Sequence, residues 1–198
     1  MFNLIKSLNK FTPYDERENY DLIETLHFLN SNQNAFDRSN PPGHITAGAL
    51  VCDTAGNVLL NHHKKTGMWF QFGGHSDGNP NTYEVALREV FEESGINTFL
   101  SAPDSIFDVS IQDIEPNKKR NEPAHHHFDI NFLFVAKDHN FKISNESTEI
   151  KWCSLDEARK LADPNDYVIL RMLNKYEKLL KSAKLIKNTA KNNKIIKK

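Results

Sequence analysis

The stretch Arg88-Glu89-Val90-Phe91-Glu92-Glu93-Ser94-Gly95-Ile96 decides how the rest of the chain is interpreted. Its three carboxylates, Glu89, Glu92 and Glu93, stand at positions i, i+3 and i+4, which fall on one face of a helix. Carboxylates at such short spacing repel one another. A hard divalent cation such as Mg²⁺ or Mn²⁺ would offset the repulsion by binding their oxygens. The alternative is a solvated acidic helix face. Gly95 supplies a natural helix end.

A glycine-rich segment, Gln71-Phe72-Gly73-Gly74-His75-Ser76-Asp77-Gly78, precedes this stretch. Counted from Gly74, the combination resembles the Nudix box of the Nudix hydrolases, G-x5-E-x7-R-E-U-x-E-E-x-G-U, where U is a bulky aliphatic residue. The positions from Arg88 to Ile96 match in full. One position differs, because the first glutamate of the box is Pro80 here and Glu84 lies four residues too late to replace it.

The resemblance implies roles for individual residues. Glu89 and Glu93 are the expected principal ligands of a Mg²⁺ or Mn²⁺ ion, and the carbonyl of Gly73 is expected to add another oxygen. Glu92 completes the metal site or receives the proton of the attacking water, and Arg88 braces the carboxylates. The expected catalytic residues are therefore Glu92, Glu89 and Arg88.

Pro80 leaves one role of the box open, because in the family the glutamate at this position helps to hold the arginine and the carboxylates. Asp77 or Glu84 is a candidate replacement, or Arg88 needs no partner there. A weakened or lost activity is the other consequence to consider.

A second cluster of polar residues is His125-His126-His127-Phe128-Asp129. In a strand, His125, His127 and Asp129 share one face. Two histidines and a carboxylate suit a transition metal, and they also suit recognition of phosphate or ribose. The remaining interpretation is a polar strand start on the rim of a sheet.

This run also resembles a Nudix subgroup that combines Gly-Gly-His-x-Asp-Gly in the box with His-x-His-x-Asp on a later strand. Gly43-His44-Ile45-Thr46-Ala47 and the pair His62-His63 fit the same subgroup. The expected substrate-binding residues are His125, His127, Asp129, Gly74 and His75.

The length of 198 residues suits one domain with extensions. The fold class is expected to be α/β, a Nudix-type α/β/α sandwich with a central mixed sheet and an N-terminal helical extension. The expected boundaries are residues 1–43 for the extension, 44–181 for the Nudix domain with its C-terminal helix, and 182–198 for a basic, flexible tail.

Hydrophobic periodicity and breaker residues predict the individual elements. Helices are expected at residues 15–30, 81–94, after Ser154 and at 166–180. Strands are expected at residues 45–52, from 58, at 68–72 leading into a Gly-Gly turn, and at 105–114, 126–136 and 150–152. In the helix 81–94, Val85, Ala86, Val90 and Phe91 are expected to pack against the sheet.

The charge distribution is asymmetric. The net charge is −1, but residues 175–198 hold nine lysines and one acid, so the rest of the chain carries −9. Such a tail can contact nucleic acid or an anionic membrane, or it can be a solvated helix end. It has no aromatic residue after Tyr176 to stack on bases, so no stable nucleic-acid complex is expected.

The chain has no apolar run near the ~20 residues that span a bilayer and no apolar core of a signal peptide at its start, so no membrane association is expected. Cys52 and Cys153 are far apart in apolar contexts and are expected to be buried free thiols. These features predict a cytoplasmic protein.

The leading functional expectation is divalent-metal-dependent hydrolysis of a diphosphate linkage in a nucleoside diphosphate joined to another moiety X, with a nucleotide-like substrate. Glu115 or Glu122 is a candidate catalytic base. The first alternative is a nucleotide-binding or regulatory module with weak or no catalysis, which Pro80 motivates. The second is an isomerase of isoprenoid diphosphates, which would need a catalytic cysteine in the cleft. A homodimer is possible, and the sequence does not identify X.

Overall fold

The computed structural model describes residues 2–117 and 122–195. Its strands form one mixed sheet, in which β1 and β7 are parallel and the other pairs are antiparallel. The sheet order is β3-β2-β1-β7-β5, with β4 on β1, β6 on β7 and β8 on β2. The strands are β1 (Gly43–Cys52), β2 (Val58–His63), β3 (Trp69–Phe70), β4 (Phe72–His75), β5 (Phe99–Ser101), β6 (Asp108–Ile114), β7 (His125–Ala136) and β8 (Ser147–Cys153).

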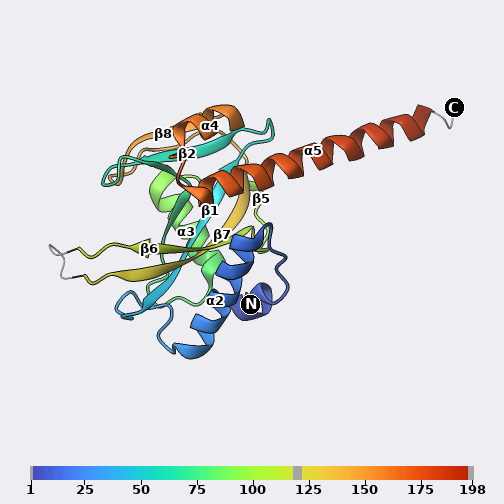
Figure 1. Ribbon diagram of the computed structural model, residues 1–198. Helices are drawn as coiled ribbons and strands as arrows, with labels where there is room; N and C mark the ends of the chain where they lie inside the picture. The colour runs from blue at the N-terminus through green and yellow to red at the C-terminus, as the bar shows by residue number, and fades with distance from the viewer. Residues whose placement is uncertain (1, 118–121, 196–198) are drawn as a thin grey trace.

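Helices cover both faces of the sheet (Figure 1). The first core cluster joins the sheet to α1 (Leu4–Leu8), α2 (Glu16–Ser31) and α3 (Thr82–Ser94), and the second joins it to α4 (Leu155–Leu161) and α5 (Tyr167–Ile195). Alternation along β1 separates the two clusters, because Ala49 and Val51 belong to the first and Leu50 and Cys52 to the second. The expected α/β/α sandwich with a mixed sheet and an N-terminal helical extension is confirmed.

Several expected elements have different bounds. The single strand predicted at 68–72 is wrong, because the segment divides between β3, which pairs with β2, and β4, which pairs with β1. The predicted Gly-Gly turn is therefore part of strand β4. The final helix is longer than predicted, since α5 continues to Ile195 and extends beyond the sheet (Figure 1). The short elements α1 and β5 were not predicted.

Other expectations concern individual side chains. Ser154 caps α4 in a reciprocal capping box with Glu157, as predicted. Cys52 and Cys153 are buried free cysteines, also as predicted. Phe91 does not pack against the sheet and is 50% exposed, whereas Val90 beside it is fully buried.

The proposed division at residues 43 and 181 stays a prediction, and residues 196–198 of the expected flexible tail lie outside the described residues. None of the helices in the described part of the chain is long and apolar enough to cross a membrane.

A buried network of charges ties the N-terminal helix α2 to β6 and α5. The guanidinium of Arg171 donates to both carboxylate oxygens of Asp108, at 2.9 and 2.7 Å, and to the carbonyl oxygen of Val109. Lys175 donates to Asp108 and to Glu18, whose carboxylate also accepts the Val109 N–H. Glu18 and Asp108 are fully buried, so their charges depend on these two cations.

Replacing Arg171 by Met is expected to lower the free energy of unfolding by about 3–5 kcal/mol, because it leaves buried carboxylates without a counter-charge. Urea denaturation checks the value. The control is Arg159→Met, which removes an ion pair to Glu177 outside the core and should have a far smaller effect. Equal losses in the two variants would contradict a stabilising role for the network.

Candidate active site

Helix α3 presents the carboxylates of the box. It begins after Asn81, whose side chain accepts the backbone N–H of Glu84, and it ends at Gly95. Gly95 adopts φ +74°, so the predicted helix end is confirmed, and its left-handed conformation favours glycine. The buried residues Val85, Ala86 and Val90 fix the rotation of the helix about its axis.

Close packing of glycines brings β4 against both β1 and α3. A Cβ atom at Gly48 would lie 2.3 Å from the Phe72 carbonyl oxygen, and one at Gly73 would lie 3.0 Å from the Gly48 Cα. A Cβ at Gly74 would lie 2.6 Å from the Glu89 carboxylate. Only glycine therefore lets the α3 carboxylates rest directly on the β4 backbone.

The three carboxylates of α3 have different surroundings. The Glu93 side chain is buried and accepts the Gly73 N–H at 3.2 Å, while Glu92 is exposed. Burial raises the pKa of Glu93 to about 8, despite the Gly73 hydrogen bond. Burial also raises the pKa of Glu89, against the opposing effect of Arg88. This end of the helix therefore holds negative charge at a cost that a nearby cation would relieve.

A cavity of about 770 Å³ contains the expected site residues of α3 and β4 together with two of β7. Among the residues that line it are Gly73, Gly74, His75, Arg88, Glu89, Glu92, Glu93, His127 and Asp129. The structure thus brings together nine of the ten residues expected from the sequence. The tenth, His125, lies beside His127, with 3.2 Å between their Nε2 atoms.

The carboxylates are not drawn together into a tight cluster. Among the described residues, only His44, His125 and His127 form a group of three or more histidine, cysteine or acidic side chains whose potential ligand atoms all lie within 4.8 Å of one another. Glu89, Glu92 and Glu93 share the cavity at wider spacing, as mutual repulsion requires.

Arg88 spans α3 and β4 without a box glutamate. Its Nη2 donates to the His75 carbonyl oxygen at 2.7 Å and to Glu89 at 2.6 Å, and its Nε lies 4.0 Å from Glu92. Asp77 does not replace the missing glutamate by direct contact, because it forms a two-bond ion pair with Arg38. The backbone carbonyl of His75 instead supplies the oxygen that orients the guanidinium.

The polar face of β7 forms another wall of the cavity. His127, Asp129 and Asn131 alternate along it, as a strand predicts. Asp129 accepts a hydrogen bond from Thr46 on β1, and burial raises its pKa to about 6. His127 stands opposite His44 in the parallel register of β1 and β7, and burial with neighbouring histidines lowers the pKa of His127 to about 3.

Besides Lys65, two charged residues that line the cavity were missed. Glu146 precedes β8 and faces the cavity, whereas neither candidate base from the sequence, Glu115 or Glu122, is among the lining residues. Arg38 reaches the cavity from the segment between α2 and β1. No local motif identifies either residue, because the long-range packing of the sheet brings them in.

A second cavity, of about 750 Å³ between α1 and α5, is less suitable as a metal-dependent active site. Its lining includes Lys6, Lys10, Lys175 and Lys178 but, as an acid, only Asp104. Cysteine chemistry has no place in either cavity, because Cys52 and Cys153 lie in the second core cluster and burial raises the pKa of both thiols.

Comparison with known proteins identifies the family and the fold. The family model described as "NUDIX domain" matches residues 42–173. No curated protein matches the chain. Solved structures match the chain, and three of them, described next, have the same fold.

An Ap4A hydrolase from C. elegans, in a binary complex, has 23% identity and a TM-score of 0.53, covering 70% of this chain and 98% of that one. A MutT protein from Methanosarcina mazei Go1 has 21% identity and a TM-score of 0.52, covering 72% and 98%. The dihydroneopterin triphosphate pyrophosphohydrolase of E. coli has 14% identity and a TM-score of 0.51, covering 65% and 94%.

Fold and site together define an α/β/α sandwich whose acidic helix packs on a glycine-rich strand beside a polar cavity. The chain belongs to the NUDIX domain family, the family of the Nudix-type pyrophosphohydrolases.

The raised pKa of Glu93 predicts how pH changes stability in metal-free protein. The unfolded carboxyl ionises near 4.5 while the folded one keeps its proton to about 8, so its burial costs stability increasingly as the pH rises across that interval. Glu93→Gln keeps an acceptor for the Gly73 N–H and removes the ionisation. The variant should become more stable than the parent by up to about 5 kcal/mol at the upper end.

Thermal unfolding from pH 4.5 to 8 in a chelator measures this difference. Glu84→Gln, on the exposed part of the same helix, serves as the control and should show no growing difference. If the difference in stability between the parent and Glu93→Gln stayed constant across this pH range, the raised pKa of Glu93 would be contradicted.

Proposed function

We propose that this chain hydrolyses a diphosphate linkage in a nucleoside diphosphate joined to another moiety, with a divalent cation as cofactor. The single observation that carries the proposal is the set of three α3 carboxylates, Glu89, Glu92 and Glu93, lining one cavity with the strand glycines Gly73 and Gly74. Membership in the NUDIX domain family supports the reaction class.

The residues fit Mg²⁺ or Mn²⁺. All the expected donors are oxygens, the ligand type that hard cations prefer, and they would come from Glu89, Glu92, Glu93 and the Gly73 carbonyl. Glu93 takes part in no ion pair among the described residues, so its buried carboxylate lacks a compensating cation. A bound divalent cation supplies charge neutralisation of the phosphates and acidifies a water molecule.

The chain's own residues contribute positioning and proton transfer. Arg88 holds Glu89 against β4 by its bonds to Glu89 and the His75 carbonyl. Glu92 is exposed at the cavity edge, which suits a group that accepts a proton from water. Glu146 also lines the cavity, and we assign it as the loop base in place of Glu115 and Glu122.

Size and charge favour a nucleotide-like substrate. The cavity of about 770 Å³ lies in the range of small-molecule sites. Arg38 and Lys65 line it and can neutralise phosphate charge, while Phe70 offers an aromatic surface for a base. His75, His127 and Asp129 would contact polar groups of the substrate.

A binding or regulatory module is the second candidate function. It is favoured by Pro80, which is exposed, and by the Arg88 Nε, which is buried without a hydrogen-bond partner. This module would bind the same ligands without turning them over. We further propose a cytoplasmic location and no stable complex with nucleic acid. Sedimentation distinguishes a monomer from the homodimer that the sequence leaves open.

A substrate screen with Mg²⁺ or Mn²⁺ tests the main proposal. ADP-ribose, NADH, nucleotide sugars, dinucleoside polyphosphates and nucleoside triphosphates are incubated with the protein, and products are resolved by ion-exchange chromatography. Ap4A and dihydroneopterin triphosphate are included because proteins of similar structure carry those substrates in their names. Calorimetric binding without any product would favour the module instead.

Replacing Glu92 or Glu93 by Gln is expected to reduce kcat on the best substrate by about 100-fold or more, which corresponds to about 2.7 kcal/mol in the barrier. The exchange preserves side-chain size and removes from the cavity a carboxyl group that can ionise and bind a cation. Glu84→Gln, which removes a charge from an exposed position of the same helix, is the control. Near-native turnover in both cavity variants would show that Glu92 and Glu93 are not the catalytic carboxylates.

Glu146→Gln is expected to lower kcat by about 10²–10⁴-fold, as for loss of a general base, and to shift the acidic limb of the pH–rate profile. Its control is Glu115→Gln, outside the cavity, which should leave the profile unchanged. If Glu115→Gln and not Glu146→Gln removed the activity, the base would be assigned to the β6–β7 connection.

A further inference from the structure

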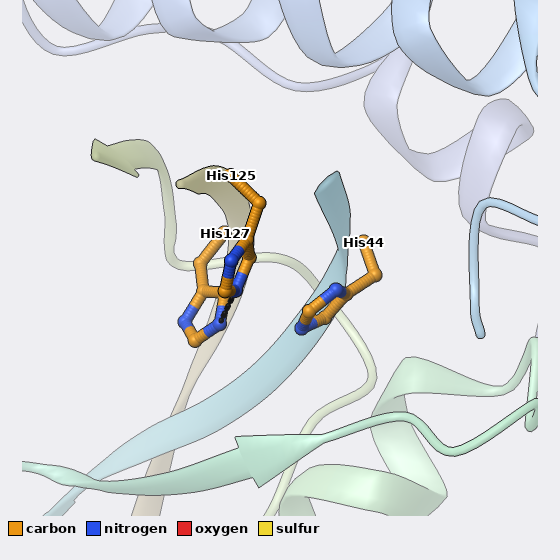
Figure 2. Close-up of side chains that lie close together, drawn as sticks. All are labelled: His44, His125 and His127. Atoms are coloured by element: carbon orange, nitrogen blue, oxygen red, sulfur yellow. Dashed lines mark hydrogen bonds between the residues drawn. The ribbon is translucent and has the colours of Figure 1, made fainter. Parts of the chain in front are cut away.

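Three histidines from two parallel strands meet at one end of the sheet. Figure 2 shows the rings of His125 and His127 on β7 and the ring of His44 turned toward them from β1. Ring centroids are 4.7 Å apart for His44 and His127, 5.0 Å for His44 and His125, and 5.1 Å for His125 and His127. The register of β1 and β7 sets this arrangement, because His44 pairs with His127.

His44 is the unusual member of the group. It is 1% exposed, yet neither its Nδ1 nor its Nε2 has a hydrogen-bond partner. A buried imidazole in a folded protein normally has a partner for at least one ring nitrogen, so this ring lacks an interaction that the fold alone does not provide. Its nitrogens lie among the other imidazoles rather than among apolar side chains.

We propose that His44, His125 and His127 together bind one first-row transition metal ion, with Zn²⁺ as the ion of reference, at a site separate from the α3 carboxylates. One potential ligand nitrogen from each ring lies within 4.8 Å of the others. Three imidazoles are a ligand set that zinc takes in proteins, with a fourth position left for water or another donor.

The distance between His125 and His127 already suits a metal. Their Nε2 atoms are 3.2 Å apart. Two nitrogens bound to one tetrahedral Zn²⁺ at 2.0–2.1 Å are separated by about 3.3–3.4 Å. An ion could therefore take the place of the proton between these nitrogens with little movement of β7, and His44, already turned toward them, would supply the third nitrogen.

A backbone contact prepares His125 for this role. Its Nδ1 lies 2.9 Å from the Pro123 carbonyl oxygen, which can only accept, so this nitrogen carries the proton and Nε2 presents its lone pair toward His127. Hydrogen bonding of the distal ring nitrogen to a carbonyl is the usual way in which a protein orients a histidine ligand.

The rings are also in the protonation state that binding needs. Burial lowers the pKa of His44 to about 4 and that of His127 to about 3, so both are neutral at physiological pH. A purely electrostatic role of these histidines toward phosphate would need charged rings instead.

The fourth position lies toward the cavity. His127 lines the cavity, and the ring of His75 is 4.9 Å from that of His44 and 5.1 Å from that of His127 between centroids. His75 or water would complete the coordination. The nitrogen ligands of this site are softer than the oxygen ligands of α3. Zn²⁺ is therefore expected to bind the histidines and Mg²⁺ the carboxylates.

The test uses the whole chain, stripped with a chelator and then held in excess Mg²⁺ to occupy oxygen-ligand sites. Zn²⁺ is titrated against a chromophoric chelator, and Co²⁺ replaces it for absorption spectroscopy. We expect one equivalent of Zn²⁺ per chain, intense visible bands from tetrahedral Co²⁺, and a Tm that rises with Zn²⁺.

His127→Gln and His44→Gln should weaken Zn²⁺ binding by about 100-fold or more. The matched control is His126→Gln on the same strand, because its exposed side chain pairs with Asp113 on the other face and should leave binding unchanged. Circular dichroism verifies the fold. If the buried His44 variant fails to fold, the half-buried His127 position decides alone.

Three results would overturn the proposal. These are the absence of stoichiometric Zn²⁺ binding to the parent chain, equal affinity in His127→Gln and His126→Gln, or loss of Zn²⁺ binding in a Glu89→Gln, Glu93→Gln double variant with the histidines intact. Because the readouts are binding, spectrum and Tm, they stand whether or not the chain hydrolyses any substrate.

Discussion

The site depends on how closely the backbone of β4 approaches its neighbours. Gly48 and Gly73 let β1 and β4 pair where a Cβ atom on either would meet backbone, and Gly74 leaves the space in which the Glu89 carboxylate rests. A side chain at Gly74 would displace the Glu89 carboxylate from the strand backbone, and with it the carboxylate that Arg88 contacts. The glycines of the box thus act through packing, by setting the distance at which an acidic helix can lie on a sheet.

That approach has an electrostatic consequence. Glu93 is buried by this close packing, and burial raises its pKa to about 8. Among the described residues, the Gly73 N–H is the one hydrogen-bond donor that replaces the lost water. The buried acids of the network between α2, β6 and α5 differ, because Asp108 and Glu18 form ion pairs with Arg171 and Lys175. The chain therefore pairs these structural acids with cations, whereas the acids of the cavity have too little positive charge beside them. Such a loss of stability is expected at a functional site.

The sequence predicts the features that local chemistry determines. The i, i+3, i+4 spacing of the carboxylates, the Gly95 helix end, the Ser154 capping box and the alternation of His127 and Asp129 on one face all follow from residues near one another in the chain. What the sequence does not predict depends on pairing between distant segments. The parallel register that sets His44 beside His127 is one example, and the entry of Glu146 into the cavity is another. The strand at 68–72 fails for a related reason, because tertiary pairing to two partners divides it at Gln71.

β1 connects these observations, since it pairs with β4 through its middle residues, Thr46 to Ala49, and with β7 along its whole length. One strand therefore carries both Gly48, which admits the glycine-rich strand β4, and His44, which faces the β7 histidines. The α3 carboxylates lie against β4 on one side of β1, and the two β7 imidazoles lie on its other side, so β1 stands between two sets of ligands of different hardness. Because β1 is buried throughout, a shift of its register by one residue would turn His44 and Thr46 away from the cavity side and disrupt both ligand sets together.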